Sequence, residues 1–221
     1  MVLPFDTGKG DMLLLAASIA LPVLLAGLWH ESGLGGGLFF SFFLSLCFVL
    51  IHYSQLQDCL SVLCRLVFGA VYIGFLLAHL VLIWQLPEGN QWLVILTAIT
   101  AGSDSGAYYC GKTFGKHKLC PAVSPNKTVE GALGGLVCGI FAAVVFAAIL
   151  LDSVNWGVLV VVAILLTGVG ILGDLCESII KRGTNTKDSG TILLGHGGIL
   201  DRVDSLLLAA PVLYYLHIFT G

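Results

Sequence analysis

Long apolar stretches follow one another along the whole chain, separated by short polar segments. An α-helix needs about 20 apolar residues to cross a bilayer, and these stretches lack the strict alternation typical of a membrane-spanning strand. We therefore predict an all-α polytopic integral membrane protein with about seven transmembrane helices, over residues 11–29, 34–53, 60–84, 91–110, 131–151, 156–174 and 205–219. The glycine-rich segment GLGGG at 33–37 is predicted to form the turn between the first two helices.

The composition supports a membrane protein. Of the 221 residues, 57% are hydrophobic and only 10% are charged, whereas soluble domains carry about 25% charged residues. The seven cysteines form no CxxC pair, and we expect them to be small apolar fillers rather than a disulfide framework. The first apolar stretch has no evident small-residue cleavage site, so we interpret it as a retained helix and not as a signal peptide.

The distribution of the ten Lys and Arg residues predicts the orientation. Four lie in the loop 111–130 and four in the loop 175–204, and positively charged loops face the cytoplasm. Counting helices from these loops places the N-terminus in the cytoplasm and the C-terminus outside. We divide the chain into residues 1–95, with three transmembrane helices and no recognised motif, and residues 96–221, a catalytic transmembrane region that carries both loops.

Acidic residues gather at the predicted inner ends of three helices. A carboxylate near hydrocarbon is costly and usually faces a bundle interior, although each could also cap a helix end at the membrane surface. Glu177 and Ser178 share a helix face with one of them, Asp174. Crowded carboxylates repel one another unless a cation lies among them, and hard oxygen ligands suit Mg²⁺. The expected metal ligands are Asp174, Asp201, Asp104 and Asp204.

The polar loops contain candidate phosphate-binding groups. The segment GKTFGKHK at 111–118 mixes glycines with lysines, although it lacks the P-loop pattern. In SPNKTVEG at 124–131, Thr128 could cap the following helix, with Glu130 in its first turn and Lys127 beside it. Together with HGG at 196–198, these loops indicate a highly phosphorylated substrate that is met by metal and lysine.

The segment SIIKRGTNTKDSGTILLGHGGILDRVDS at 178–205 resembles the signature of the phosphatidate cytidylyltransferase (CDP-diacylglycerol synthase) family. GDLCES at 173–178 and SDSGAYYCGKTFGKHKLCPAVSPNKTVEG at 103–131 are similar to further motifs of that family. The resemblance covers about residues 100–210. It implies transfer of a cytidylyl group from CTP to phosphatidic acid, which gives CDP-diacylglycerol and pyrophosphate, at the cytoplasmic face of the membrane.

The resemblance also implies roles for individual residues. Catalytic roles fall on Lys187, Asp188, His196, Asp201, Arg202 and Ser178. Substrate binding falls on Lys112, Lys127, Lys181, Arg182, Gly197 and Gly198. His196 would hold or protonate a phosphate oxygen, Asp188 would orient Lys187 or contact the nucleotide, and Ser178 would fix the metal site or the lipid head. The implied cofactor is Mg²⁺, with a second, monovalent cation such as K⁺ left open.

Other functions compete with this interpretation. A CTP-dependent enzyme for a different lipid phosphate or lipid alcohol, similar to CDP-archaeol synthases or to polyprenol and phytol kinases, would be a related membrane protein. A transporter would place acids at the midplane and on both sides of it, whereas these gather at the inner face. An inactive scaffold is the third alternative.

The expected partners are CTP, phosphatidic acid and membrane lipids, with no nucleic acid; the choice between monomer and homodimer stays open. We expect the bacterial inner (plasma) membrane as the location, with an organellar membrane as the alternative.

Overall fold

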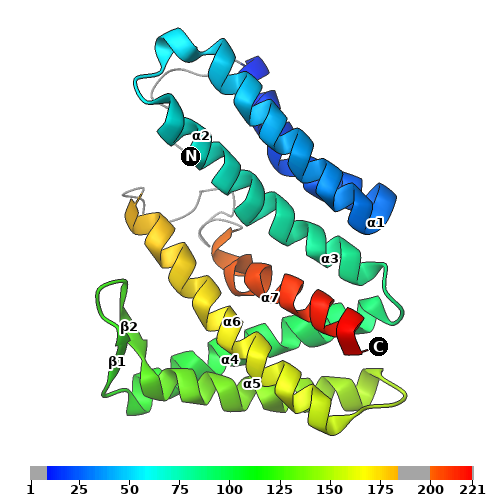
Figure 1. The fold of residues 1–221 in the computed structure, drawn as a ribbon. Helices are drawn as coiled ribbons and strands as arrows, with labels where there is room; N and C mark the ends of the chain where they lie inside the picture. The colour runs from blue at the N-terminus through cyan, green and yellow to red at the C-terminus, as the bar shows by residue number, and fades with distance from the viewer. Residues whose placement is uncertain (1–8, 184–199, 221) are drawn as a thin grey trace. The chain divides into compact units, whose positions relative to one another are not determined.

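The computed structural model describes residues 9–183 and 200–220 and divides the chain into two compact units, Met1–Leu86 and Pro87–Gly221. Helices make up most of both units (Figure 1). The division falls between Leu86 and Pro87, earlier than the boundary after residue 95 that the sequence suggested. The whole of the fourth predicted span therefore belongs to the second unit.

The first unit begins with a long helix, α1 (Lys9–Ile51), which folds back on itself. The break lies at Trp29 and His30, where His30 has a positive φ of 53°. The predicted turn at 33–37 is therefore wrong: these residues are helical. A Cβ at Gly37 would approach the Cα of Pro22 to 2.5 Å, so the glycines let the two halves of α1 touch instead of forming the turn.

A second membrane-length segment completes the first unit. It consists of α2 (Cys59–Gly69), the π-helical turn η2 (Ala70–Phe75) and α3 (Leu76–Trp84), which follow one another without interruption. A short 3₁₀ turn, η1 (Tyr53–Gln55), precedes α2, whose first turn is capped by the Asp58 side chain. Gly74 in the π-helical turn lies against the backbone of Ile19 in α1, and this close contact fixes the segment on α1.

The described part of the second unit contains four helices and one small sheet: α4 (Gly89–Phe114), β1 (Lys118–Cys120), β2 (Ser124–Thr128), α5 (Val129–Leu150), α6 (Trp156–Gly183) and α7 (Leu200–Thr220). Its helices include the four predicted spans, except that α5 ends one residue earlier than expected. Helices α4 and α6 also continue into the segments that we expected to be loops, because α4 ends at Phe114 and α6 at Gly183.

A short antiparallel β1–β2 hairpin, which the sequence did not predict, lies between α4 and α5 of this otherwise helical fold. Lys118 is opposite Thr128 and Cys120 is opposite Ser124, with an irregular register between them. The turn is closed by a hydrogen bond from the Val123 N–H to the Cys120 carbonyl, 3.2 Å long. Pro121 occupies the second position of this turn, where its fixed φ is favourable. The hairpin lies at one end of the paired helices α4 and α5 (Figure 1).

Small residues let α4 and α5 pack with their backbones in contact. One face of α5 presents a buried small residue at every fourth position: Gly131, Gly135, Gly139, Ala143 and Ala147. A Cβ at Gly135 would come within 2.8 Å of the Ser103 carbonyl oxygen in α4. Helices in lipid associate through such close packing because hydrophobic burial gives little driving force there.

The outer faces of the helices are strongly apolar. Phe141 of α5 is 70% exposed and Val137 is 67% exposed, which is expected of side chains that face lipid. Four helical stretches in the described residues are long and apolar enough to cross a membrane: Asp11–Ile51, Cys59–Trp84, Val129–Leu150 and Trp156–Gly183. Helix α7 contributes the shorter apolar stretch Val203–Ile218. The chain is therefore a predominantly helical integral membrane protein.

Candidate active site

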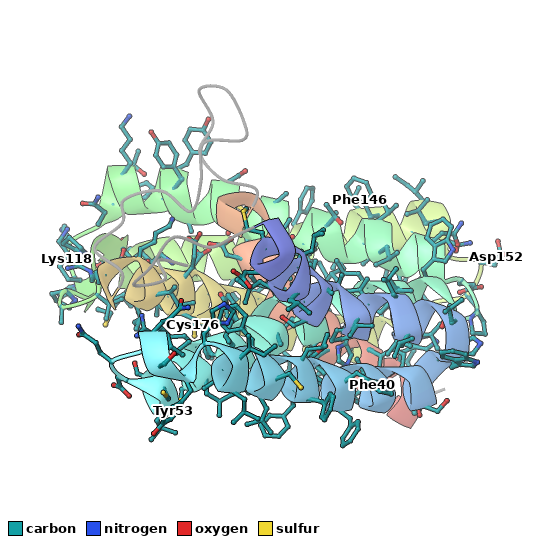
Figure 2. All side chains as sticks on the ribbon, turned by 90° about the horizontal axis from the view of Figure 1, so that it is seen from above. Phe40, Tyr53, Lys118, Phe146, Asp152 and Cys176 are labelled. Carbon is teal, nitrogen blue, oxygen red and sulfur yellow. The ribbon has the colours of Figure 1, made fainter. Side chains whose placement is uncertain are left out.

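A cavity of about 510 Å³ opens beside the hairpin, entirely within the second unit. Its walls come from α4, the hairpin, the first turn of α5, and α6. The polar side chains that line it include Asp104, Tyr108, Lys112, Asn126, Lys127 and Asp174. Figure 2 shows that Lys118 of the hairpin and Cys176 of α6 lie at the same end of this unit, whereas Asp152 lies at the opposite end. The cavity therefore belongs to the basic end of the unit.

Lys127 and Asp174 form an ion pair in the cavity. The Lys127 Nζ lies 2.7 Å from the Asp174 Oδ2, and the two side chains are 26% and 27% exposed. Lys127 lies near the end of strand β2, just before α5, and Asp174 lies in α6, so the contact joins the hairpin to α6. Partial burial reduces solvent screening of this pair relative to a fully exposed one.

Two further carboxylates lie close to Asp174. Asp204 of α7 is only 8% exposed, and its carboxyl group is in side-chain contact with that of Asp174. Asp104 of α4 lies near enough to interact electrostatically with both Asp174 and Lys127. The Ser205 hydroxyl is 3.5 Å from the Asp104 Oδ2. Three of the four predicted metal-ligand aspartates are thus brought together from three helices.

Close packing of α6 on α7 produces this convergence. A Cβ at Gly173 would come within 2.6 Å of the Asp204 carbonyl oxygen, so only glycine lets the two backbones approach here. The Asp204 Oδ1 accepts a hydrogen bond of 2.8 Å from the Ser205 N–H, which orients the carboxylate at the start of α7. The neighbouring residue in α6 is Asp174, and its carboxylate is thereby placed against that of Asp204.

The last turns of α6 carry three more predicted residues, and each is engaged with protein groups. The Ser178 hydroxyl donates to the Asp174 carbonyl oxygen at 2.9 Å, so its contact is with the helix backbone. Lys181 forms a 2.9 Å ion pair with Glu177, which is 5% exposed. The Arg182 Nε donates a hydrogen bond to the Val123 carbonyl oxygen in the turn of the hairpin.

The base of the hairpin is fixed on α5. Thr128 caps α5 as expected, since its hydroxyl accepts a hydrogen bond from the Gly131 N–H at 3.1 Å. Glu130 lies in the first turn as expected, and it also accepts from the backbone N–H groups of Lys116 and His117 and from the His117 Nδ1. These last contacts were not foreseen from the sequence.

Several predicted site residues lie outside the described residues: Lys187, Asp188, His196, Gly197 and Gly198. Asp201 and Arg202 belong to the first turn of α7, but their side chains are likewise outside the description. Lys112 is described, and its Nζ lies 5.7 Å from the centre of the Tyr108 ring. Tyr108 and Asn126 were missed as cavity residues, although Tyr108 lies four residues after Asp104 and therefore on the same face of α4.

The chemistry of the cavity suits a hard divalent cation. Among the described residues, no group of three or more His, Cys, Asp or Glu side chains is arranged to hold a metal ion. However, Mg²⁺ is usually held by one or two carboxylates together with waters and substrate phosphates. Two carboxyl groups in contact, as in Asp174 and Asp204, repel each other unless a proton or a cation lies between them. The donor set therefore fits Mg²⁺.

Comparison with known proteins identifies one matching family and several relatives with the same name. A model of the cytidylyltransferase family matches residues 6–219. A phosphatidate cytidylyltransferase of Bacillus subtilis is 43% identical over 149 residues, which cover 67% of this chain and 55% of the relative. One of Staphylococcus epidermidis is 36% identical over 210 residues, covering 93% of this chain and 79% of the relative. One of Staphylococcus aureus is 38% identical over 176 residues, 80% of this chain and 66% of the relative.

Proposed function

The chain belongs to the cytidylyltransferase family, and from that premise we propose that it is a phosphatidate cytidylyltransferase. It joins CTP and phosphatidic acid to form CDP-diacylglycerol and releases pyrophosphate. The observation that carries this function is the cavity lined by Lys112, Lys127, Asp104 and Asp174. Asp204 lies against Asp174. Such a mixture of cations and carboxylates suits a substrate with many phosphate groups.

The reaction is a nucleotidyl transfer. A phosphate oxygen of phosphatidic acid attacks the α-phosphorus of CTP, a new P–O bond forms, and the bond to the β-phosphate oxygen breaks with release of pyrophosphate. The lipid phosphate is already a nucleophile, so no strong general base is needed. Catalysis of this kind consists mainly of positioning and charge neutralisation. Lys112 and Lys127 would bind phosphate oxygens, with Lys187, Arg202 and His196 as further candidates from the segment before and at the start of α7.

Mg²⁺ is the proposed cofactor. Asp174 and Asp204 would hold it, with Asp104 and Asp201 as additional ligands. When bound, it would neutralise charge on the phosphates. The Lys127 ammonium group already lies on the Asp174 Oδ2, so Lys127 would share the Asp174 carboxylate with the bound cation. Whether a monovalent cation also takes part is decided by the same assay with and without K⁺.

We further propose seven membrane spans. They are the two halves of α1, the continuous segment from α2 to α3, and the helices α4, α5, α6 and α7. The basic end with the hairpin faces the cytoplasm, which places the N-terminus inside and the C-terminus outside. CTP is a cytoplasmic metabolite, so this orientation gives it access to the cavity. The bacterial relatives favour the plasma membrane as the location.

The decisive experiment is an assay of the purified protein in detergent with radiolabelled CTP, Mg²⁺ and phosphatidic acid. We expect lipid-soluble label and stoichiometric pyrophosphate, both lost in Asp174→Asn and both kept in the matched control Asp152→Asn at the opposite end of the unit. Label on another lipid phosphate but not on phosphatidic acid would contradict the proposed acceptor. Absence of CTP binding would contradict the function as a whole. Light scattering of the same sample distinguishes a monomer from a homodimer.

A further inference from the structure

We propose that Glu130 and Arg182 are positioning residues that hold the two ends of the β1–β2 hairpin, so that Lys127 is presented to Asp174. Glu130 holds the base of the hairpin on α5, and Arg182 holds its turn on α6. Neither residue touches substrate in this scheme; both act through Lys127. The kinetic test of this inference rests on the proposed function, but the test by amide hydrogen exchange does not.

The contact at the base is made by one carboxylate with several donors. The Glu130 Oε2 accepts from the N–H groups of Lys116 and His117 at 3.1 and 3.2 Å, and the Oε1 lies 2.7 Å from the His117 Nδ1. The Val129 N–H donates to the His117 carbonyl oxygen at 2.9 Å. The segment that enters β1 is thus fixed to the first turn of α5.

The contact at the turn comes from a different helix. The Arg182 Nε donates to the Val123 carbonyl oxygen, across a sequence separation of 59 residues. Val123 is the last residue of the turn between the strands, since its N–H closes the turn on Cys120. Arg182 therefore connects the far end of the hairpin with the last turn of α6, the same helix that carries Asp174.

A hairpin of this size needs such external contacts. An isolated two-stranded hairpin is at best marginally stable in water, and here the strands have three and five residues with an irregular register. Lys127 lies near the end of β2, and its Nζ must reach a single carboxylate oxygen on α6. Displacement of a catalytic group by about 1 Å can reduce the rate about 100-fold. Fixing both ends of the hairpin keeps Lys127 in place.

The geometry argues against direct substrate contacts for these two residues. Lys127, Lys112 and Asp174 line the cavity, whereas Glu130 and Arg182 are not among the described residues that do. Both oxygens of the Glu130 carboxylate already accept hydrogen bonds from protein donors. Arg182 uses its Nε on a backbone carbonyl. Their observed partners are all in or next to the hairpin.

The first test is kinetic and uses double mutants. Arg182→Ala and Glu130→Ala should each lower kcat/KM about 10–100-fold, with partial rescue by Arg182→Lys and Glu130→Gln, which keep one donor or one acceptor. In a Lys127→Ala background, either alanine substitution should lower kcat/KM by less than about a further twofold, because the effects of coupled residues are not additive. Lys118→Ala, a cation of the same hairpin outside the cavity, is the matched control and should retain activity. A full additional tenfold loss from Arg182→Ala in the Lys127→Ala background would overturn the proposal.

The second test needs no activity. Amide hydrogen exchange of the full-length protein in detergent should accelerate across residues 116–128 in Glu130→Ala and in Arg182→Ala, with α4 and α5 unchanged. Lys118→Ala should leave this segment as in the wild type. Unchanged exchange in both variants would overturn the proposal even if activity falls. A wild-type protein without cytidylyl transfer would contradict the proposed function, while the exchange result would still decide whether the two contacts hold the hairpin.

Discussion

Asp174 contacts three other residues of the candidate site. Its carboxylate binds Lys127, 47 residues earlier in the chain, and touches that of Asp204, while its carbonyl oxygen accepts from Ser178. One ammonium group and one further carboxyl group therefore act on the same side chain. The two carboxyl groups repel each other wherever both are ionised and no cation is bound.

This repulsion leads to a prediction for Asp204→Asn. The amide keeps an acceptor for the Ser205 N–H but cannot carry a negative charge. At alkaline pH, where both carboxyl groups are ionised, the melting temperature in EDTA should therefore rise, by about 2–4 °C for each ~1 kcal/mol of repulsion removed. The Mg²⁺ concentration for half-maximal activity should rise as well. Thermal unfolding in EDTA measures the first effect and an activity titration with Mg²⁺ measures the second, with Asp152→Asn as the control in both. A lower melting temperature in EDTA would show that the second carboxylate stabilises the metal-free protein.

At the residue scale, the sequence indicated which side chains belong to the candidate site better than it indicated their partners. Helical spacing and membrane depth were enough to single out Asp104, Asp174 and Asp204. The pairing of Lys127 with Asp174 could not be foreseen, because it depends on how α6 packs beside the hairpin. Glu130 was expected only to interact with the dipole of α5, and its bonds to His117 depend on the path of the chain before β1.

At the scale of elements, the contact between α4 and α5 determines the shape of the cavity. The small residues of α5 touch the α4 backbone, and this contact leaves the larger α4 side chains Asp104, Tyr108 and Lys112 to line the cavity. The pair of helices also carries the hairpin between them. The orientation of the hairpin therefore depends on the distance between α4 and α5.

We predict that Gly135→Leu severely destabilises the protein. A Cβ at this position already approaches the Ser103 carbonyl oxygen to 2.8 Å, and overpacking of a tight interface costs about 1–3 kcal/mol or more. The melting temperature in detergent should fall by several degrees and activity should decrease with it. Val137→Leu on the exposed face of the same helix should change neither. Equal melting temperatures for the two variants would contradict the backbone contact.

The elements themselves were only partly predictable. Within the described residues, the apolar stretches of the sequence coincide with helical segments, because lipid requires long apolar helices. The glycines at 33–37 misled the prediction, since glycine serves both turns and close helix contacts, and only tertiary packing distinguishes the two uses. The repeat of small residues from Gly131 to Ala147 was missed, although its small-xxx-small spacing is typical of close helix contacts. The strands of the hairpin are too short to give a periodic signal.

At the scale of the whole molecule, the second unit has chemically different ends. One end holds the cavity and the basic residues Lys112, Lys116, Lys118 and Lys127, and the other holds Asp152 in the α5–α6 connection. This asymmetry supports the proposed orientation, in which the basic end faces the cytoplasm.

The orientation can be tested by labelling intact cells. In a cysteine-free background, Asp152→Cys should react with a membrane-impermeant maleimide added to intact cells, and Lys118→Cys should react only after permeabilisation. The physical reason is that the reagent cannot cross the lipid and reaches external thiols alone. Gel shifts measure both reactions. The reverse pattern would contradict the orientation, and labelling of both sites in intact cells would contradict a membrane-spanning α5.

The close contact between α4 and α5 also bears on how the protein is made. These helices are consecutive in the chain, so the ribosome releases them one after the other, and their glycine faces can pair as soon as both have entered the bilayer. The hairpin between them can form at the same time, from neighbouring residues. Asp174 and Asp204 are synthesised later. Biogenesis thus has a natural order in which the hairpin with Lys127 can form before Asp174 and Asp204 are synthesised, and these two carboxyl groups then meet an ammonium group already in place.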